Sequence, residues 1–335
     1  MSQAGASPGL TVAVTGAGGY LASRLVRRLS ADDRVARVVA LDVAPVRAPH
    51  PKVVADHFDV RNDALEERLA GVDVLVHLAF VMNPARDERA MRDVNVAGSH
   101  NAFRCAARAG VPAIVYASSM TVYGAHPDND VPLRETSPLR ANVDFSYAAH
   151  KLEVEYVVEE VRADYARTKI AVLRPAVAFG PHADNAWSHL LELPVLLGVR
   201  GHRPPLQFVH EDDAVDAFAF AVHARLDGAY NLVPPDWLDA DAVDAIVGRR
   251  RVDVDEERAW RIAARLWELG LAEAPAGMLH YVMHPWVGSG DRLAAAGFRC
   301  ERTSAEALAA TARRARGRVR VGRWAAPRRA VLGAA

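Results

Sequence analysis

The chain has 335 residues, of which 51% are hydrophobic and 24% are charged, a balance that excludes a wholly disordered protein. Its 41 basic residues are matched by 41 acidic residues, so the positive surplus typical of nucleic-acid-binding proteins is absent and no nucleic-acid partner is expected. The sequence has no apolar run near the ~20 residues of a membrane span and no signal-peptide pattern, and Cys105 and Cys300 lack metal-ligand spacing, so we expect a cytoplasmic protein without a membrane partner or a metal.

Short apolar strands alternate with helical segments over the first half of the chain. Strands are predicted over 10–15, 35–41, 52–58, 72–78, 113–117 and 170–173, and helices over 20–30, 64–69, 87–109 and 145–166. Such alternation is typical of βαβ units, in which right-handed crossovers place helices over a parallel sheet. The sequence therefore predicts an α/β fold of the Rossmann type, with a doubly wound parallel sheet.

The pattern loosens after Pro175. The sequence predicts a helical stretch at 186–198, a strand at 206–209, a helix at 211–224, a strand at 229–232 and mostly helical chain beyond 235. Because a second full βαβ series is missing, this half is interpreted as a smaller, mostly helical C-terminal lobe.

A glycine-rich turn joins the first predicted strand to the first helix. Gly16 and Gly19 permit a tight turn and let a pyrophosphate reach backbone N–H groups, and the small Ala22 lets the helix lie close to the strand. Asp42 ends the second strand about 20 residues further on, where a carboxylate accepts a hydrogen bond from a ribose hydroxyl. The same carboxylate would repel a 2′-phosphate, so we predict a dinucleotide cofactor, NAD rather than NADP.

These signals divide the chain into four parts. We expect a disordered N-terminus at 1–9, a dinucleotide-binding Rossmann domain at 10–175, a substrate-binding lobe at 176–312 with some strands returning to the main sheet, and a basic tail at 313–335. The arginine-rich tail is interpreted either as a solvated end or as a contact for an anionic partner or a neighbouring subunit.

Tyr147 and Lys151 are four residues apart on a predicted helix and therefore share a face. An ammonium beside a phenol is expected to lower the pKa of the tyrosine, which can then exchange a proton with a substrate oxygen near neutral pH. Lysines occur at only three positions, 52, 151 and 169, and a compact ammonium suits position 151 better than a guanidinium. The pair predicts a proton-transfer site.

Six segments follow one another in a fixed order. They are 15–22, His-Leu-Ala at 77–79, Asn-Val-Ala-Gly at 95–98, Ala-Ser-Ser-Met-Thr-Val-Tyr-Gly at 117–124, the Tyr147/Lys151 pair, and Leu-Arg-Pro-Ala-Val-Ala-Phe-Gly-Pro at 173–181. Together they resemble the extended short-chain dehydrogenase/reductase superfamily, in its NAD-dependent epimerase/dehydratase branch. The resemblance is strong over 10–235 and weak over 291–298, and it implies an NAD(P)-dependent enzyme of the epimerase/dehydratase or ketoreductase type.

The resemblance also implies roles for particular residues. Ser119 would hydrogen-bond the reacting oxygen, Tyr147 would be the general acid/base, and Lys151 would tune the tyrosine and hold the nicotinamide ribose. With the glycine turn and Asp42, the expected cofactor-binding residues are Gly16, Gly19, Tyr20, Leu21, Asp42, Asp59, Val60, Leu78, Ala79, Asn95, Tyr147 and Lys151.

Four side chains near these motifs carry other interpretations. Ser118 is an alternative to Ser119 as the catalytic hydroxyl, and Asn95 is either a helix-positioning or a packing residue. His77 lies inside an apolar strand and is predicted to be structural. His150 lies off the Tyr147/Lys151 face and is predicted to be exposed.

Two positions depart from the pattern of relatives that act on nucleotide-sugars. Val177 stands where those relatives carry asparagine, and Leu206-Gln207 stands where they carry Arg-Asp. An arginine there would neutralise a substrate phosphate, which leucine cannot do. Compensating side chains are available at Arg200, Arg203, His182, His189 and His202. Side chains that could line an apolar pocket are Phe80, Met82, Trp187, Leu190, Leu191 and Leu196.

We therefore predict an enzyme that transfers a hydride between NAD and a secondary alcohol or ketone of a small-molecule substrate, which is not a typical nucleotide-sugar. One alternative is a sugar-nucleotide epimerase or dehydratase with bound NAD. Another is a non-catalytic NAD-sensing scaffold. A homodimer is left open as the assembly.

Overall fold

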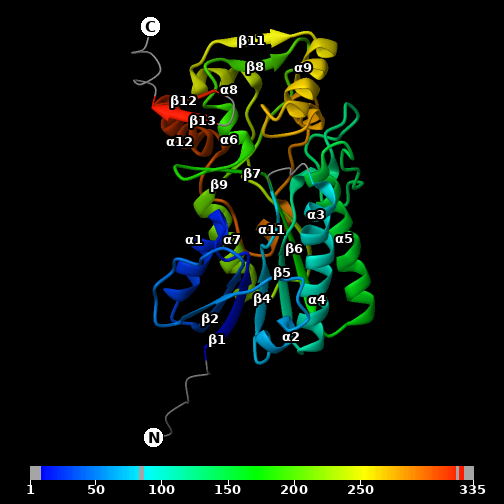
Figure 1. Ribbon diagram of the computed structural model, residues 1–335, viewed down its shortest axis with the longest axis vertical. Helices are drawn as coiled ribbons and strands as arrows, with labels where there is room; N and C mark the ends of the chain where they lie inside the picture. Colours follow the sequence, from blue (N-terminus) through cyan, green and yellow to red (C-terminus); the bar gives the residue numbers. More distant parts are fainter. Residues whose placement is uncertain (1–8, 83–86, 322–323, 328–335) are drawn as a thin grey trace, which may run out of the picture.

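The computed structural model describes residues 9–82, 87–321 and 324–327 (Figure 1). The expected disordered segment 1–9 therefore lies outside the described residues except for Gly9, as do Arg323, Arg328 and Arg329 of the expected basic tail. In Figure 1 the central sheet and its helices form the lower half of the molecule, and the later elements form a lobe above it.

Seven parallel strands form the central sheet. They are β1 (Leu10–Thr15), β2 (Val35–Asp42), β3 (Val53–His57), β4 (Val74–His77), β5 (Ala113–Ala117), β6 (Lys169–Pro175) and β10 (Gly228–Leu232), in the order β10-β6-β5-β4-β1-β2-β3. The order reverses at β1, which lies between β2 and β4. In open α/β sheets the ligand binds beyond the carboxyl ends of the strands at such a point. The predicted doubly wound sheet is confirmed, and β10 joins it from the second half of the chain.

Helices cover both faces of this sheet. On one face lie α1 (Tyr20–Ser30) and α7 (Glu211–Ala224), and on the other lie α2 (Leu65–Arg68), α4 (Gly98–Arg108) and α5 (Ser146–Asp164). Alternate strand residues serve the two cores: Val12 and Val14 belong to the first, and Ala13 to the second. Because both faces are covered, central strands such as β4 and β5 are buried along nearly their whole length, whereas the edge strand β3 is partly exposed.

The helix predicted over 87–109 is interrupted. It consists of α3 (Glu88–Arg92), a π-helical turn η1 (Asp93–Ala97) and α4. A π-helical turn widens the helix locally and often occurs at functional sites. Here it contains Asn95, and sequence periodicity did not reveal it.

The lobe is built from short elements. Two-stranded parallel sheets join β7 (Val177–Phe179) to β9 (Phe208–His210) and β8 (Leu196–Val199) to β11 (Arg251–Val254). The other elements are η2 (Met120–Tyr123), α6 (Ala186–Leu190), α8 (Ala240–Val247), α9 (Glu256–Glu268), η3 (Ala276–Leu279), α10 (His280–Met283), α11 (Asp291–Ala295), α12 (Ser304–Arg316), β12 (Arg318–Val321) and β13 (Trp324–Pro327).

One prediction for the lobe was wrong in detail. The helix predicted at 186–198 ends at Leu190, and the chain passes Pro194 before it enters β8. Proline has no amide donor and disfavours the helical conformation of the preceding residue, so the apolar run beyond it pairs as a strand. The described region beyond 235 is mostly helical, as predicted, and also contains the short strands β11, β12 and β13.

The end of the lobe includes the start of the expected basic tail. Helix α12 runs through Arg316, so Arg313, Arg314 and Arg316 belong to a regular helix, and Arg314 pairs with the buried Glu192. Among the described residues, none of the helices combines the length and the apolar character needed to cross a bilayer.

Candidate active site and cofactor cleft

A cavity of about 630 Å³ lies at the carboxyl ends of the strands and extends toward the lobe. It brings together predicted residues from segments far apart in the sequence. The predicted residues that line it are Gly16, Gly19, Tyr20, Leu21, Asp42, Asp59, Val60, Leu78, Ala79, Ser119, Tyr147 and Lys151. Asn95 is not among its lining residues.

The turn between β1 and α1 forms one wall. Gly16 has a φ of +70°, and a Cβ there would lie 2.6 Å from the backbone nitrogen of Ala79, so only glycine lets the turn lie against the end of β4. At Gly19 a Cβ would lie 3.1 Å from the carbonyl oxygen of Gly16. Helix α1 has no side-chain cap and no acidic residue in its first turn. Its N-terminal amides and helix dipole can therefore receive an anionic group.

Asp42 lies at the end of β2, beside this turn. One carboxylate oxygen accepts a hydrogen bond from the N–H of Gly18 (2.9 Å), and the other accepts from the N–H of Ala44 (2.7 Å). These bonds hold the carboxylate at the cavity wall. Asp42 and the glycine turn, about 20 residues apart in the sequence, are thus in direct contact.

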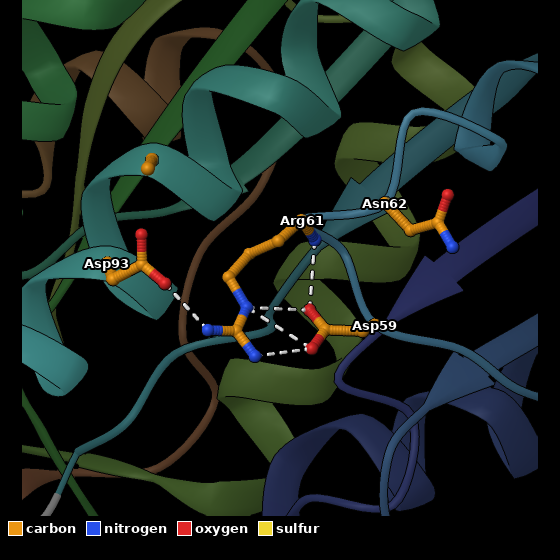
Figure 2. Close-up of a pocket in the computed structure, with 5 residues that line it drawn as sticks. Asp59, Arg61, Asn62 and Asp93 are labelled. Carbon is orange, nitrogen blue, oxygen red and sulfur yellow. Dashed lines mark hydrogen bonds and ion pairs between the residues drawn. The ribbon is translucent and has the colours of Figure 1, made fainter.

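A shallower pocket of about 500 Å³ adjoins this end of the cavity (Figure 2). The guanidinium of Arg61 donates to both carboxylate oxygens of Asp59 and to Asp93 (2.6 Å). Hydrogen bonds from Arg61 hold the pKa of the Asp59 carboxyl below its usual value. Sequence reasoning singled out Asp59 but missed Arg61, which lines both pockets and is two residues away.

Asn95 is fully buried and acts on the loop after β4. Its Oδ1 accepts from the N–H of Val81 (2.6 Å), and its Nδ2 donates to the carbonyl of Val81 (3.1 Å). Its Nδ2 also lies 3.3 Å from Nδ1 of His150. Asn95 thus holds residue 81, which lines the cavity, without lining it itself. His150 is only 7% exposed, so the prediction of an exposed histidine was wrong, because its imidazole lies against Asn95 of η1.

Ser119, Tyr147 and Lys151 meet at the end of β5. Ser119 lies beside Tyr147, and hydrogen bonding by its hydroxyl acts to lower the pKa of the tyrosine. The ammonium of Lys151 donates to the carbonyl of Ala117 (2.5 Å) and lies 3.5 Å from the centre of the Phe80 ring. The hydroxyl of Ser118, the alternative candidate, instead donates to Glu155 (2.5 Å). The geometry therefore favours Ser119 as the partner of the tyrosine.

The ionisation of Tyr147 differs from the sequence-based expectation. Burial raises the pKa of Tyr147 to about 12, and the hydrogen bond with Ser119 opposes this rise only in part. Lys151 lies 5.8 Å from the tyrosine ring centre, and burial lowers the pKa of its own ammonium well below the usual value. In this structure desolvation outweighs the lysine, so the expected low tyrosine pKa is not observed.

His77 is enclosed by hydroxyl groups. The hydroxyl of Ser99 donates its proton to the carbonyl of Asn95, so toward His77 this hydroxyl can only accept, and Nε2 of His77 carries the proton that it accepts. Nδ1 of His77 is then unprotonated and accepts from the hydroxyl of Thr15 (2.8 Å). Burial lowers the pKa of this imidazole to about 3. A neutral histidine with both nitrogens occupied fits the predicted structural role.

The far end of the cavity is apolar. Among the residues expected to form an apolar pocket, Phe80, Met82 and Trp187 line it, joined by Met278 and Trp286. Leu190, Leu191 and Leu196 are not lining residues. Of the described lining residues, Arg61 and Lys151 are the only arginine and lysine, and both lie in the nucleotide half.

The expected compensating cations do not reach this end. Arg200 pairs with Asp255, Arg203 with Asp241, and His202 with Glu256, and none of these arginines and histidines, nor His182 or His189, is a lining residue. Gln207 is fully engaged, since its amide bonds the backbone of Gly288 and Pro234. Val177, in contrast, lines the cavity.

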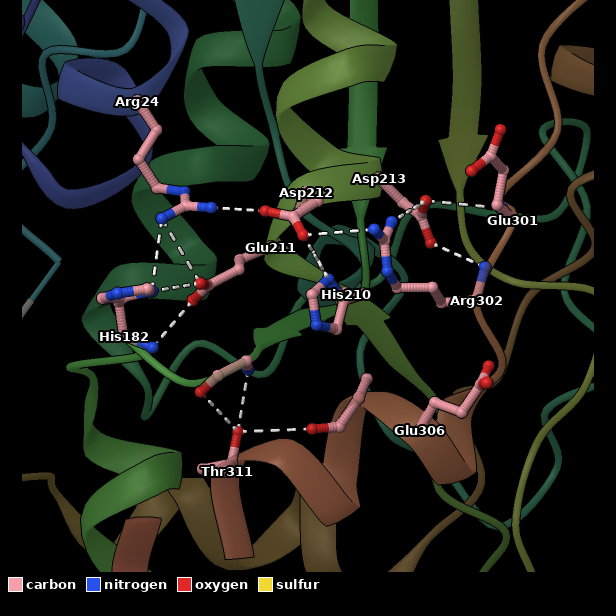
Figure 3. A network of polar contacts seen from close by, with 12 residues as sticks. Arg24, His182, His210, Glu211, Asp212, Asp213, Glu301, Arg302, Glu306 and Thr311 are labelled. Atoms are coloured by element: carbon pink, nitrogen blue, oxygen red, sulfur yellow. Dashed lines mark hydrogen bonds and ion pairs between the residues drawn. The ribbon is translucent and has the colours of Figure 1, made fainter. Parts of the chain in front are cut away.

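Glu211, buried at the start of α7, connects the nucleotide half to the lobe (Figure 3). Its carboxylate accepts hydrogen bonds from the hydroxyl of Tyr20 and from the N–H of His182 (3.1 Å), and Arg24 lies 3.4 Å from it. At Gly180 a Cβ would lie 2.4 Å from the Glu211 carboxyl carbon. Sequence reasoning missed this residue because an acidic first turn is ordinary for a helix.

Comparisons with known proteins agree with this geometry. A family model described as the NAD dependent epimerase/dehydratase family matches residues 12–233. An uncharacterised protein of Mycobacterium tuberculosis (strain ATCC 25618 / H37Rv) is 29% identical over 230 residues, 66% of this chain and 61% of that protein. Sterol demethylase protein B of Methylococcus capsulatus (Bath) is 29% identical over 229 residues, 67% of this chain and 62% of that protein. The chain thus spans less than two thirds of the length of these curated relatives.

Solved structures show the same architecture. The UDP-glucose 4-epimerase of Thermus thermophilus, in complex with NAD, has a TM-score of 0.70 and 22% identity, covering 92% of this chain and 99% of that one. At this identity the likeness establishes the fold. The family match includes nearly the whole central sheet and the Ser119, Tyr147 and Lys151 positions, and it covers more than half of the sequence. The chain belongs to the NAD dependent epimerase/dehydratase family.

Proposed function

We propose that this chain is an NAD-dependent oxidoreductase that transfers a hydride at a secondary alcohol or ketone of a largely apolar small molecule. The observation that carries the proposal is the character of the cavity. Its nucleotide end has a glycine turn and a carboxylate, its middle has the Ser119/Tyr147/Lys151 set, and its far end is apolar.

The nucleotide end fits a dinucleotide. The missing side chains at Gly16 and Gly19 and the uncapped start of α1 leave backbone N–H groups for a pyrophosphate. Asp42 is positioned to accept from a ribose hydroxyl and would repel a 2′-phosphate, which favours NAD over NADP. Asp59 and Val60 would contact the adenine, and Leu78 and Ala79 would line the groove between the two ends.

The middle of the cavity fits proton transfer to an oxygen. NAD supplies or accepts the hydride at its nicotinamide when it is bound. Ser119 would orient the substrate oxygen, and Tyr147 would donate the proton to it. Because its pKa is raised to about 12, Tyr147 is protonated near neutral pH, which is the state needed to reduce a carbonyl group. Lys151 would hold the nicotinamide ribose.

The far end supports an apolar substrate. A nucleotide-sugar carries a diphosphate, and such groups are bound by arginine or lysine side chains. None of the described lining residues contributed by the lobe is an arginine or a lysine; aromatic and aliphatic side chains such as Trp187, Trp286 and Met278 occupy these positions. A ketone or alcohol on a larger apolar skeleton matches this lining.

The test is a ligand and turnover screen. Mass spectrometry of the purified protein should identify any retained NAD, and NADH absorbance should report turnover with ketones on aliphatic and polycyclic skeletons. Tyr147→Phe is the matched control, since it removes one hydroxyl. Ketone-dependent NADH oxidation that Tyr147→Phe abolishes supports the proposal. Conversion of UDP- or dTDP-sugars would favour an epimerase or dehydratase. NAD binding without turnover of any substrate would favour the scaffold alternative.

A further inference from the structure

We propose that Glu155 is a positioning residue of this site: it holds the end of β5 against α5 and supplies the counter-charge for Lys151. The inference rests on the proposed function for its catalytic meaning. Its structural part concerns Glu155, which neither the motifs nor the family resemblance singled out. Glu155 is 6% exposed and follows Lys151 by four residues, on the same face of α5.

Three successive turns of α5 contact three consecutive residues at the end of β5, although not in the same order. Tyr147 lies beside Ser119, and Glu155, two turns further along, accepts from the hydroxyl of Ser118 (2.5 Å). Holding the Ser118 side chain therefore restrains the backbone that carries Ser119, whose hydroxyl lies beside Tyr147.

Lys151 lies on α5 between Tyr147 and Glu155, one turn from each. Its ammonium donates to the carbonyl of Ala117 (2.5 Å), the residue that precedes Ser118. The segment 117–119 is thus held at each of its residues from one helix. Without the contact from Glu155, the Ser118 side chain would lose its described partner, and the residue would be held through its backbone, whose N–H donates to the carbonyl of Leu173 (2.8 Å).

Glu155 is itself fixed from the sheet. Arg174, 4% exposed at the end of β6, donates to Oε1 (2.9 Å) and to Oε2 (2.5 Å) of the carboxylate. Another nitrogen of Arg174 donates to the hydroxyl of Tyr123 (2.7 Å), which in turn donates to Asn231 (2.7 Å). This bidentate pairing gives the carboxylate one orientation.

The negative charge of Glu155 gives it a second role, toward the ammonium of Lys151. Lys151 is buried, and the titratable groups around it are Glu155 on its own helix, His77 on β4, Tyr116 on β5 and Tyr147. Among them Glu155 is the carboxylate. Burial lowers the pKa of the ammonium, and Glu155 acts against this effect. Loss of the carboxylate would leave two buried cations, Lys151 and Arg174, without this counter-charge.

The experiment uses the scarcity of lysine in this chain. Protein labelled at the lysine ε-carbon gives three resonances, from Lys52, Lys151 and Lys169, and Lys151→Arg assigns the one of interest. In Glu155→Gln the titration midpoint of Lys151 should fall by about 1 pH unit. Lys52 and Lys169 should not move and serve as internal controls. Glu155→Asp keeps the charge and should recover part of the shift.

The matched control is Asp213→Asn. Asp213 is also buried and paired with an arginine, Arg302 (3.0 Å), and it does not line the cavity. Asp213→Asn should lower the free energy of unfolding without changing the titration midpoint of Lys151. An unchanged midpoint in folded Glu155→Gln, or an equal shift in Asp213→Asn, would overturn the inference. Because this measurement needs no substrate, it is independent of the proposed reaction.

The positioning part has its own variant. Ser118→Ala leaves the Glu155–Arg174 pair in place and removes only the hydroxyl that connects it to β5. With the substrate from the screen, kcat should fall about 10-fold, while the KM for NAD stays near the wild-type value. If kcat were unchanged, the contact between Glu155 and Ser118 would have no role in catalysis. This variant also decides the positioning claim if Glu155→Gln does not fold.

Discussion

The two halves of the molecule bury their apolar residues very differently. In the sheet half, strand residues such as Ala13 and Leu75 are completely buried, because helices cover both faces. In the lobe, α9 has no buried residue at all, and Leu266 on α9 and Leu269 just beyond it are 39% and 56% exposed. The sheet half is therefore held by its own core. The lobe has a smaller core of its own, which includes Phe179, Phe208 and Leu308, and α9 lies outside it. Polar contacts such as the one from Glu211 to Tyr20 connect the lobe to the sheet half.

The two ends of the cavity are formed by these two halves of the molecule. The nucleotide end is formed by strand ends and one helix N-terminus, whose positions the sheet determines. The far end is lined by α6, the loop before η3 and the segment around Trp286, which belong to the less buried lobe. The residues proposed to bind the cofactor thus lie in the sheet half, and those proposed to contact the substrate lie mainly in the lobe.

The largest expected effect is on the core of the sheet half. Leu75→Ala removes a side chain that is completely buried in β4, so we expect a loss of about 2–5 kcal/mol in the free energy of unfolding. Urea denaturation followed by circular dichroism measures it. A loss below about 1 kcal/mol would show that the sheet half is not the better restrained region.

Removal of the Tyr147 hydroxyl should affect chemistry rather than binding. Tyr147→Phe is expected to lower kcat at least about 10²-fold, because the proton donor is lost, while the dissociation constant for NAD stays nearly unchanged. Stopped-flow turnover and NAD titration by fluorescence separate the two quantities. Near-normal turnover would remove Tyr147 from the mechanism.

Acid should weaken the sheet half through His77. The imidazole has a pKa of about 3 in the folded chain, against about 6.5 in an unfolded one, so the unfolded state takes up the proton first. The stabilisation is complete above about pH 6.5 and is lost as the pH falls toward 3. Between pH 7 and pH 5 the wild type should lose about 2 kcal/mol through this group. His77→Gln should lack that part of the loss, and equal pH dependence of both proteins would contradict the assignment.

Asp42→Ala should produce a smaller change at the nucleotide end. It removes a ribose acceptor and a repulsive charge together, so the affinity for NAD should fall about 10-fold and the preference for NAD over NADP should narrow. Titration calorimetry with both cofactors measures this. Equal losses for NAD and NADP would show that Asp42 is not at the ribose.

The smallest effect is expected in the lobe. Leu266→Ala removes a side chain that is 39% exposed on α9, so the free energy of unfolding should change by no more than about 0.5 kcal/mol. It is the counterpart of Leu75→Ala, and the same denaturation experiment applies. A loss as large as that of Leu75→Ala would mean that another molecule or chain covers this face in solution.

Several features followed from local sequence alone. The apolar runs that became β1, β2, β4 and β5 could be predicted because a strand covered on both faces has no polar residues to obscure it. The glycine turn and Asp42 could be predicted because their chemistry depends on backbone geometry and on a short, regular connection. The Tyr147/Lys151 pair could be predicted because two residues four positions apart share a face of any α-helix.

Other features needed residues that are distant in sequence. The π-helical turn at 93–97 occurs where Asn95 bonds the backbone of Val81, a contact that helical periodicity does not reveal. The run at 196–199 became a strand because β11, more than 50 residues later, offers a partner. The exposure of His150 was predicted wrongly for the same reason, since Asn95 of η1, 55 residues earlier in the chain, lies against it.

By itself, the sequence determined the doubly wound sheet, the glycine turn with its acid, and the side chains that can exchange a proton. These depend on residue type and short-range spacing. The tertiary structure alone decided the electrostatic state of the site, because burial raises the pKa of Tyr147 and lowers that of Lys151, and burial is a property of the whole chain. It also decided that Ser118 faces Glu155 while Ser119 faces Tyr147, since only the packing of α5 against β5 distinguishes two adjacent serines.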